Sequence, residues 1–191
     1  MFILLLLLLG IIALFVLMNY GKKIGIEGTK AINFMATTNI VSTSDFIFHT
    51  LNDKTIEIDV EDKIFHIKGM KNKTVFLKVF GWDCKYCQKE IPELIKLKKQ
   101  LGDAFEVLAI EAQQHTKEES LAYIKKYGIN YDIIPGETHG DFYAYLQEKY
   151  GWTGIIPLTI VISKDGTVLA FELGAKSYSL SELMKSALLR E

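Results

Sequence analysis

The two cysteines of this chain stand three positions apart in the segment CKYC, and thiols at that spacing can form and break a disulfide. The pair follows an apolar run, Thr74–Phe80, and precedes a segment of helical periodicity. A sulfur in the first turn of a helix faces unpaired N–H donors and the positive end of the helix dipole, which favour the thiolate. We therefore predict that Cys84 is the exposed attacking thiol, and that the more buried Cys87 resolves the mixed disulfide. Lys85 adds a positive charge that assists Cys84, whereas Asp83 opposes it.

Two other interpretations of the cysteine pair need weighing. A zinc site takes about four nitrogen or sulfur ligands, but no further cysteine exists and the four histidines are scattered. We therefore predict no metal and no cofactor beyond a redox-active Cys84–Cys87 disulfide. A structural disulfide, or a pair of inert thiols, remains the alternative.

The elements around the motif follow from hydrophobic periodicity and capping signals. We expect a β-hairpin between Phe46 and Gly69 with its turn at Asn52-Asp53, then a buried strand at 74–80. The order of elements predicts an α/β fold with a mixed central sheet and helices on both faces. The later elements are a helix with Ile91, Leu94, Ile95 and Leu101 on one face, a strand at 105–110, a helix from the Thr116 capping box to Tyr127, a helix at 141–150, strands at 158–162 and 168–173 around a turn at 164–166, and a last helix capped by Ser179 and Glu182.

The amino-terminal segment differs in composition from the rest of the chain. Residues 2–18 are apolar except for Gly10, and at about 1.5 Å per residue they reach roughly 25 Å, the lower limit for a transmembrane helix. We expect a single membrane-spanning anchor at 1–20, a linker at 21–44 and a folded domain at 45–191. A cleaved signal peptide is the alternative, although the segment lacks a basic start and a small-residue cleavage site. The formal net charge of -1 gives no reason to expect nucleic acid binding.

Two segments carry a resemblance to a known family. Val79 to Leu94, VFGWDCKYCQKEIPEL, resembles the active-site segment of thioredoxin-like proteins, in particular the membrane-anchored TlpA/ResA/CcmG branch with its pattern FWATWCxxCxxExPxL. Gly154 to Gly166, GIIPLTIVISKDG, resembles that branch's stretch GxPTxxxIxxxG. The resemblance covers about residues 45–191 and implies a thioredoxin-like fold with an extra N-terminal hairpin.

The resemblance also implies roles for particular residues. It places a cis Pro157 against Cys84 and leaves the backbone of Ile156 free to pair with a substrate strand. Trp82 and Tyr86 are the other expected substrate contacts. It further implies that Glu90 tunes thiol acidity; from the residues alone, Glu90 would be a first-turn acid stabilised by the helix dipole.

The chain departs from the family pattern at three places. Asp83 replaces the tryptophan before the first cysteine, and the tryptophan moves to Trp82. Lys78 stands where thioredoxin has a buried acid, and a lysine in an apolar strand must snorkel, pair or lose its proton more easily. We expect Lys78 to tune the thiols, either by pairing with Glu90 or by reaching the thiolate. Tyr86 resembles the CxYC motifs of disulfide isomerases and glutaredoxins.

The expected function is that of a membrane-tethered thiol:disulfide oxidoreductase, a dithiol reductant of specific protein disulfides such as those of apocytochrome c. The resemblance implies a domain facing the periplasm or outside of the inner membrane and a membrane electron-donor thiol reductase as partner. Lys22 and Lys23 alone would favour the cytoplasm, but the lack of other cysteines fits an oxidising compartment. The alternatives are an oxidase or isomerase of secreted proteins and a redox-inactive thioredoxin-like binding module.

Overall fold

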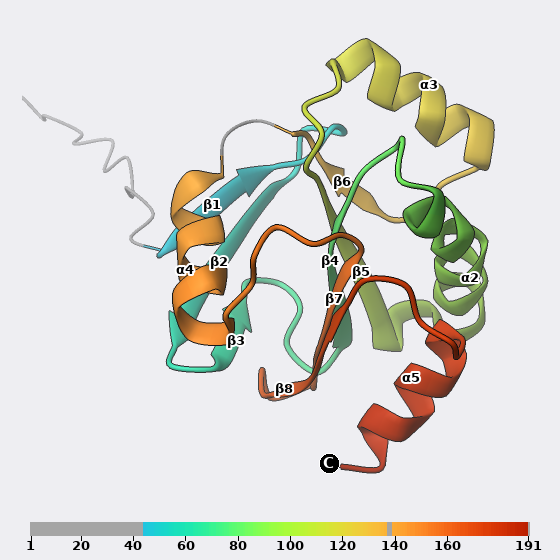
Figure 1. Cartoon of the computed structure of the whole chain (residues 1–191). Helices are drawn as coiled ribbons and strands as arrows, with labels where there is room; N and C mark the ends of the chain where they lie inside the picture. Colours follow the sequence, from blue (N-terminus) through green and yellow to red (C-terminus); the bar gives the residue numbers. More distant parts are fainter. Residues whose placement is uncertain (1–43, 137–138, 191) are drawn as a thin grey trace, which may run out of the picture. The chain divides into compact units, whose positions relative to one another are not determined.

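The computed structural model describes residues 44–136 and 139–190 (Figure 1). The expected membrane anchor at 1–20 and the linker, except for Ser44, lie outside the described residues. Within the described part of the chain, no helix has the length and apolar character needed to cross a bilayer.

The central element is a five-stranded mixed sheet in the order β6-β5-β4-β7-β8. Its middle strand β4 (Thr74–Phe80) is parallel to β5 (Phe105–Glu111) and antiparallel to β7 (Leu158–Ile162). Every residue of β4 is buried, which explains why its sequence is a nearly continuous apolar run. The outer strands are β6 (Asp132–Ile134), parallel to β5, and β8 (Val168–Leu173), antiparallel to β7. The predicted mixed sheet is confirmed.

Different elements cover the two faces of this sheet (Figure 1). Residues of α2 (Lys85–Leu101), α3 (Lys117–Tyr127) and α5 (Leu180–Leu188) join one face in a single apolar cluster. The opposite face packs against α4 (Gly140–Tyr150) and against a second, smaller sheet. A short 3-10 helix, η1 (Gly102–Ala104), links α2 to β5. Helices thus lie on both faces, as predicted.

The smaller sheet contains three antiparallel strands where the sequence predicted a two-stranded hairpin. Its order is β1 (Phe46–His49), β2 (Thr55–Glu61) and β3 (Ile64–Ile67). Asp53 and Asp62 have positive φ in the two connecting turns, a conformation that Asp tolerates better than most residues. The second turn lacks the glycine that marks many hairpins, which is why the sequence did not reveal it.

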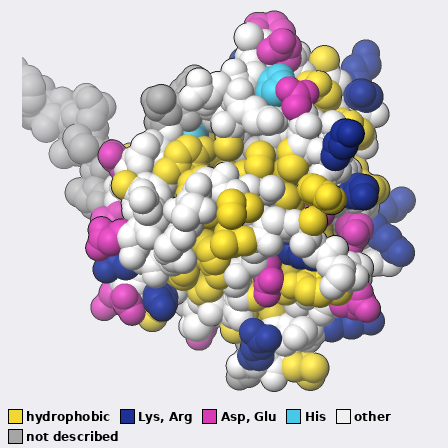
Figure 2. Space-filling view, in the orientation of Figure 1, with side chains coloured by type: hydrophobic (Ala, Val, Ile, Leu, Met, Phe, Trp, Pro, Cys, Tyr) yellow, Lys and Arg dark blue, Asp and Glu magenta, His cyan; other side chains and the backbone are white. Residues whose placement is uncertain are grey.

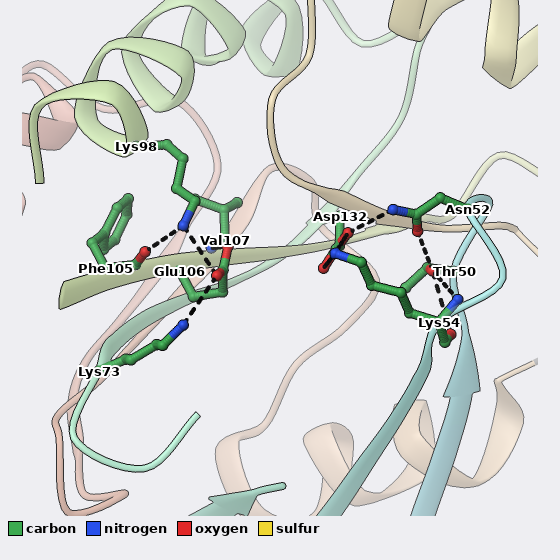
Figure 3. Close-up of polar contacts among 9 residues, drawn as sticks. All are labelled: Thr50, Asn52, Lys54, Lys73, Lys98, Phe105, Glu106, Val107 and Asp132. Atoms are coloured by element: carbon green, nitrogen blue, oxygen red, sulfur yellow. Dashed lines mark hydrogen bonds and ion pairs between the residues drawn. The ribbon is translucent and has the colours of Figure 1, made fainter. Parts of the chain in front are cut away.

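The turn between β1 and β2 is tied to the edge strand β6. The Leu51 N–H donates to the carbonyl of Ile133 at 2.8 Å. Next to it, the Asp132 carboxylate accepts from Lys54 Nζ at 2.9 Å and from Asn52 Nδ2 at 3.2 Å (Figure 3). These contacts cover part of an edge that would otherwise present unpaired backbone groups.

The other end of the small sheet is tied to the turn between β7 and β8. The Phe65 N–H donates to the carbonyl of Gly166 at 2.8 Å, and Ile64 forms an isolated antiparallel β-bridge with Thr167. Gly166 has φ +97°, and a Cβ there would lie 2.3 Å from the carbonyl oxygen of Phe65, so the contact requires glycine. The small sheet is therefore held at both sides of the large one.

Candidate active site

The junction between β4 and α2 positions the two sulfurs. Cys84 is the N-cap of α2 with extended backbone (φ -82°, ψ 109°), and its Sγ accepts the N–H of Cys87 at 3.3 Å. Cys84 is partly exposed, while Cys87, one turn into the helix, is 2% exposed. Both are free thiols. A partner can therefore reach the first sulfur but not the second.

Burial raises the pKa of the Cys87 thiol, and the hydrogen bond with Cys84 raises it further. The charge of Lys78 acts in the opposite direction on the same group. Burial disfavours the charged form of a thiol because the interior solvates the thiolate poorly. The charge of Lys78 therefore acts against the effect of burial on the Cys87 thiol.

Lys78 lies on the face of β4 that packs against α2. Alternation along the strand directs Val79 to the opposite face, so Lys78 points toward the helix that carries the cysteines. Its Nζ lies 2.5 Å from Glu90 Oε2 and donates to Thr159 Oγ1 on the neighbouring strand. Burial lowers the pKa of Lys78 to about 8, although the Glu90 carboxylate opposes this change. The predicted pairing of Lys78 with Glu90 is confirmed.

Glu90 also contacts a second lysine that the sequence did not predict. Lys176 Nζ lies 2.9 Å from Glu90 Oε1, and its side chain is 4% exposed. Lys176 follows β8, far along the chain, so no local pattern connects it to α2. Glu90 is the sixth residue of α2 and is itself buried, so the alternative of a first-turn acid is wrong. Glu90 therefore contacts two lysines with buried side chains, one from β4 and one from the segment after β8.

The proline loop precedes β7. The Ile156–Pro157 peptide bond is cis, as the resemblance implied. Pro157 is buried, and its carbonyl accepts the Gly174 N–H at 2.8 Å. Ile156 is partly buried between the two apolar clusters, whereas its neighbour Ile155 is 50% exposed. Figure 2 shows hydrophobic side chains gathered across the middle of the view, over the loop between α4 and β7.

Trp82 corrects one sequence prediction. It was expected to contact a substrate, but it is 0% exposed and out of a partner's reach. Its ring stacks on Tyr123 of α3 at 5.0 Å, and its Nε1 donates to Ser120 Oγ at 3.1 Å. Moving the tryptophan one position back from the cysteine places it in the core, where it anchors the loop. By contrast, Tyr86 is 55% exposed and Lys85 is exposed beside it.

Comparison with known proteins gives related sequences and folds. The model of the AhpC/TSA family matches residues 28–171. The thiol-disulfide oxidoreductase ResA of Bacillus thuringiensis (strain Al Hakam) is 29% identical over 120 residues, which cover 62% of this chain and 65% of that protein. The match thus spans slightly less than two thirds of this relative's length.

Solved structures share the fold. A putative thioredoxin from Neisseria meningitidis has a TM-score of 0.57 and 21% identity, over 76% of this chain and 89% of that one. A DsbF homologue from Corynebacterium diphtheriae has a TM-score of 0.57 and 22% identity, over 78% of this chain and 85% of that one. These similarities show that the described domain has the thioredoxin-like fold.

Proposed function

Because the chain belongs to the AhpC/TSA family of thioredoxin-like proteins, we propose that it is a protein thiol–disulfide oxidoreductase. The observation that carries the proposal is the pairing of a partly exposed sulfur, Cys84, with a buried one, Cys87, at the start of α2. The name of the relative described above, a thiol-disulfide oxidoreductase, supports the same activity.

The reaction proceeds in two exchanges. The Cys84 thiolate attacks a substrate disulfide, so that a Cys84–substrate S–S bond forms, the substrate S–S bond breaks, and the departing sulfur takes up a proton. The Cys87 thiolate then attacks Cys84 Sγ, forms the intramolecular disulfide and releases the second substrate sulfur, which is also protonated. The two cysteines lose two electrons and two protons, and the substrate gains them.

In the proposed mechanism, the Lys78–Glu90–Lys176 cluster assists the second exchange. Cys87 must lose its proton in a buried environment that disfavours the thiolate. The ammonium of Lys78 stabilises the thiolate as it forms, and Glu90 fixes the position of that ammonium. Lys78 and Glu90 are thus positioning residues for Cys87.

The proposed direction is reduction of specific protein disulfides, such as those of apocytochrome c, on the outer side of the inner membrane. The apolar residues 2–18 support a membrane tether, and the absence of cysteines beyond the motif supports an oxidising compartment. A membrane electron-donor thiol reductase would return Cys84–Cys87 to the dithiol. Tyr86 and the loop at Ile156 and Pro157 are the proposed substrate contacts, and the exposure of Tyr86 supports this role.

A trapping experiment tests the activity and finds the substrate. Cys87→Ala should accumulate a mixed disulfide between Cys84 and its partner in cells, because the resolving thiol is absent. Cys84→Ala is the matched control and should trap nothing. Failure of the Cys87→Ala protein to form any mixed disulfide, together with failure of the wild type to reduce insulin, would favour a redox-inactive binding module.

Two further measurements address direction and location. A reduction potential near about -270 mV indicates a reductant, whereas one near about -120 mV indicates an oxidase of secreted proteins. The oxidase is the second candidate function because Tyr86, the residue shared with the CxYC motifs of disulfide isomerases, is exposed. An alkaline phosphatase fusion to the carboxyl end should be active if the domain faces outward; an inactive fusion would place it in the cytoplasm.

A further inference from the structure

A second set of titratable groups includes Asp83, the residue directly before Cys84. His115, in the loop between β5 and α3, stands between two carboxylates. Its Nε2 lies 3.3 Å from Asp83 Oδ2, and its Nδ1 lies 3.3 Å from Glu111 Oε1. The exposure of the three side chains increases from the core to the surface: Glu111 is 0% exposed, His115 is 15% exposed and Asp83 is 64% exposed.

The buried carboxylate fixes the imidazole. Glu111 ends β5 and accepts the backbone N–H groups of Gln113 at 2.8 Å and His115 at 3.1 Å. The neighbouring Gly136 has no room for a side chain against Glu111, so the carboxylate is enclosed on that side as well. The edge of the ring packs on Tyr123, with centroids 5.8 Å apart at 90°. His115 is therefore held in one orientation by its own loop and by α3.

The same loop holds Asp83 by two contacts. The Asp83 N–H donates to Gln113 Oε1 at 2.8 Å, and the Asp83 carboxylate reaches His115. Asp83 immediately precedes Cys84, so a negatively charged residue is the direct chain neighbour of the attacking thiol. Like charges in proximity disfavour ionisation of both groups.

We propose that His115 is a positioning residue for Cys84, which in its imidazolium form neutralises Asp83 and so preserves the reactivity of the attacking thiol. The inference rests on the proposed function, in which Cys84 is the nucleophile. Histidine changes charge between pH 5 and 8. An uncharged side chain at position 115 leaves the charge of Asp83 without its partner.

Other charged groups around the imidazole contribute to the same balance. From α3, Glu119 interacts electrostatically with His115. The groove that His115 lines also contains His49, Asp53, Lys117 and His139. From α4, Tyr143 interacts with Glu111. None of these groups is a chain neighbour of Cys84, whereas Asp83 is. Asp83 is therefore the residue through which His115 acts on that sulfur.

The test is the pH profile of Cys84 alkylation in the full chain, followed by mass spectrometry of the peptide that contains Cys84. His115→Gln should lower the alkylation rate constant at pH 6 by about two- to fivefold, the range of an exposed ion pair, and should match the wild type at pH 8.5. Asp83→Asn should react at least as fast as the wild type at pH 6. In the Asp83→Asn background, the further change His115→Gln should have no effect.

His49→Gln is the matched control, because it removes an exposed imidazole from the same groove without touching Asp83. It should leave the profile unchanged. The inference would be overturned if His115→Gln lowered the alkylation rate constant equally in the wild-type and Asp83→Asn backgrounds, or if it lowered the rate constant at neither pH. Either result would leave the proposed function intact. A Cys84 that resists alkylation at every pH in the wild type would overturn both.

Discussion

Lys78 is the residue at which burial and charge compete most strongly. Folding removes water from its ammonium, so its pKa in the folded protein, about 8, lies below the ordinary value of 10.5. The unfolded chain therefore binds more protons than the folded protein between these two pH values. The contribution of Lys78 to stability therefore rises with pH across that window, because the cost of burying the charge disappears as Lys78 deprotonates.

The first prediction follows from the rise of the Lys78 contribution to stability with pH. As the pH rises from 7.5 to 9.5, the free energy of unfolding of the wild type should increase relative to Lys78→Met, by at most about 3 kcal/mol. Denaturant unfolding at the two pH values measures it. Lys125→Met, which removes an exposed lysine from α3, should show no such pH-dependent difference from the wild type. A constant difference between wild type and Lys78→Met would contradict the folded pKa of Lys78.

The second prediction separates the two thiol steps. Lys78→Met should slow release of substrate by Cys87 about three- to tenfold, because the positive charge that favours the buried thiolate is lost. Lys85→Met, an exposed change beside Cys84, should instead affect the first attack. Single-turnover kinetics with a chromogenic disulfide resolves both phases. If Lys78→Met slows both phases equally, its role is structural.

The sequence predicted the site residues that lie in short motifs, but it missed Lys176 and assigned Trp82 wrongly. Cys84, Cys87 and Pro157 lie in short motifs, so the position of the cysteines at the start of α2 and the cis bond before Pro157 could be predicted from a few neighbouring residues. Lys176 could not be predicted, because it reaches Glu90 across 86 positions of the chain without a local signal. Trp82 was misassigned because a motif gives the residue type but not the side of the backbone that packs inward.

At the scale of elements, helices with polar caps were predicted to within a few residues. The boxes Thr116–Glu119 and Ser179–Glu182 form the expected reciprocal hydrogen bonds. The strand β6 was not predicted, because three residues are too few to show a periodicity. Leu101 was expected on the buried face of α2 and is 41% exposed, since the helix ends there and the pattern no longer constrains it.

The third prediction concerns the cap of α5. Ser179→Ala should lower the free energy of unfolding by about 1 kcal/mol, because the N–H of Glu182 loses its acceptor at a helix that packs four buried residues against the core. Ser179→Asp should recover most of the loss. Ser186→Ala is the matched control, because this serine is exposed in the interior of the same helix, and it should be neutral or slightly stabilising. Thermal denaturation distinguishes the three; equal effects at positions 179 and 186 would exclude a capping role.

At the scale of the whole domain, two sheets share one apolar cluster and are also joined by polar contacts at opposite edges of the larger sheet. The candidate active site lies on the other face of the larger sheet, in the apolar cluster that contains residues of α2 and α5. Because β4 contributes alternate side chains to both clusters, a loss of packing on one face reaches the strand that carries Lys78 on the other. The domain should therefore unfold as a single cooperative unit.

The fourth prediction tests this coupling at Asp132, the acid that joins β6 to the β1–β2 turn (Figure 3). Asp132→Asn should lower the free energy of unfolding by about 1–3 kcal/mol, because it leaves Lys54 and Asn52 without a charged acceptor at a mostly buried position. Glu148→Gln makes the same chemical change in an exposed pair with Lys149 and should cost less than about 0.5 kcal/mol. Denaturation followed by both near-ultraviolet and far-ultraviolet circular dichroism should give coincident transitions in each variant. Two separated transitions in Asp132→Asn would mean that the small sheet folds independently of the site-bearing sheet, and the cooperative description of the domain would then be wrong.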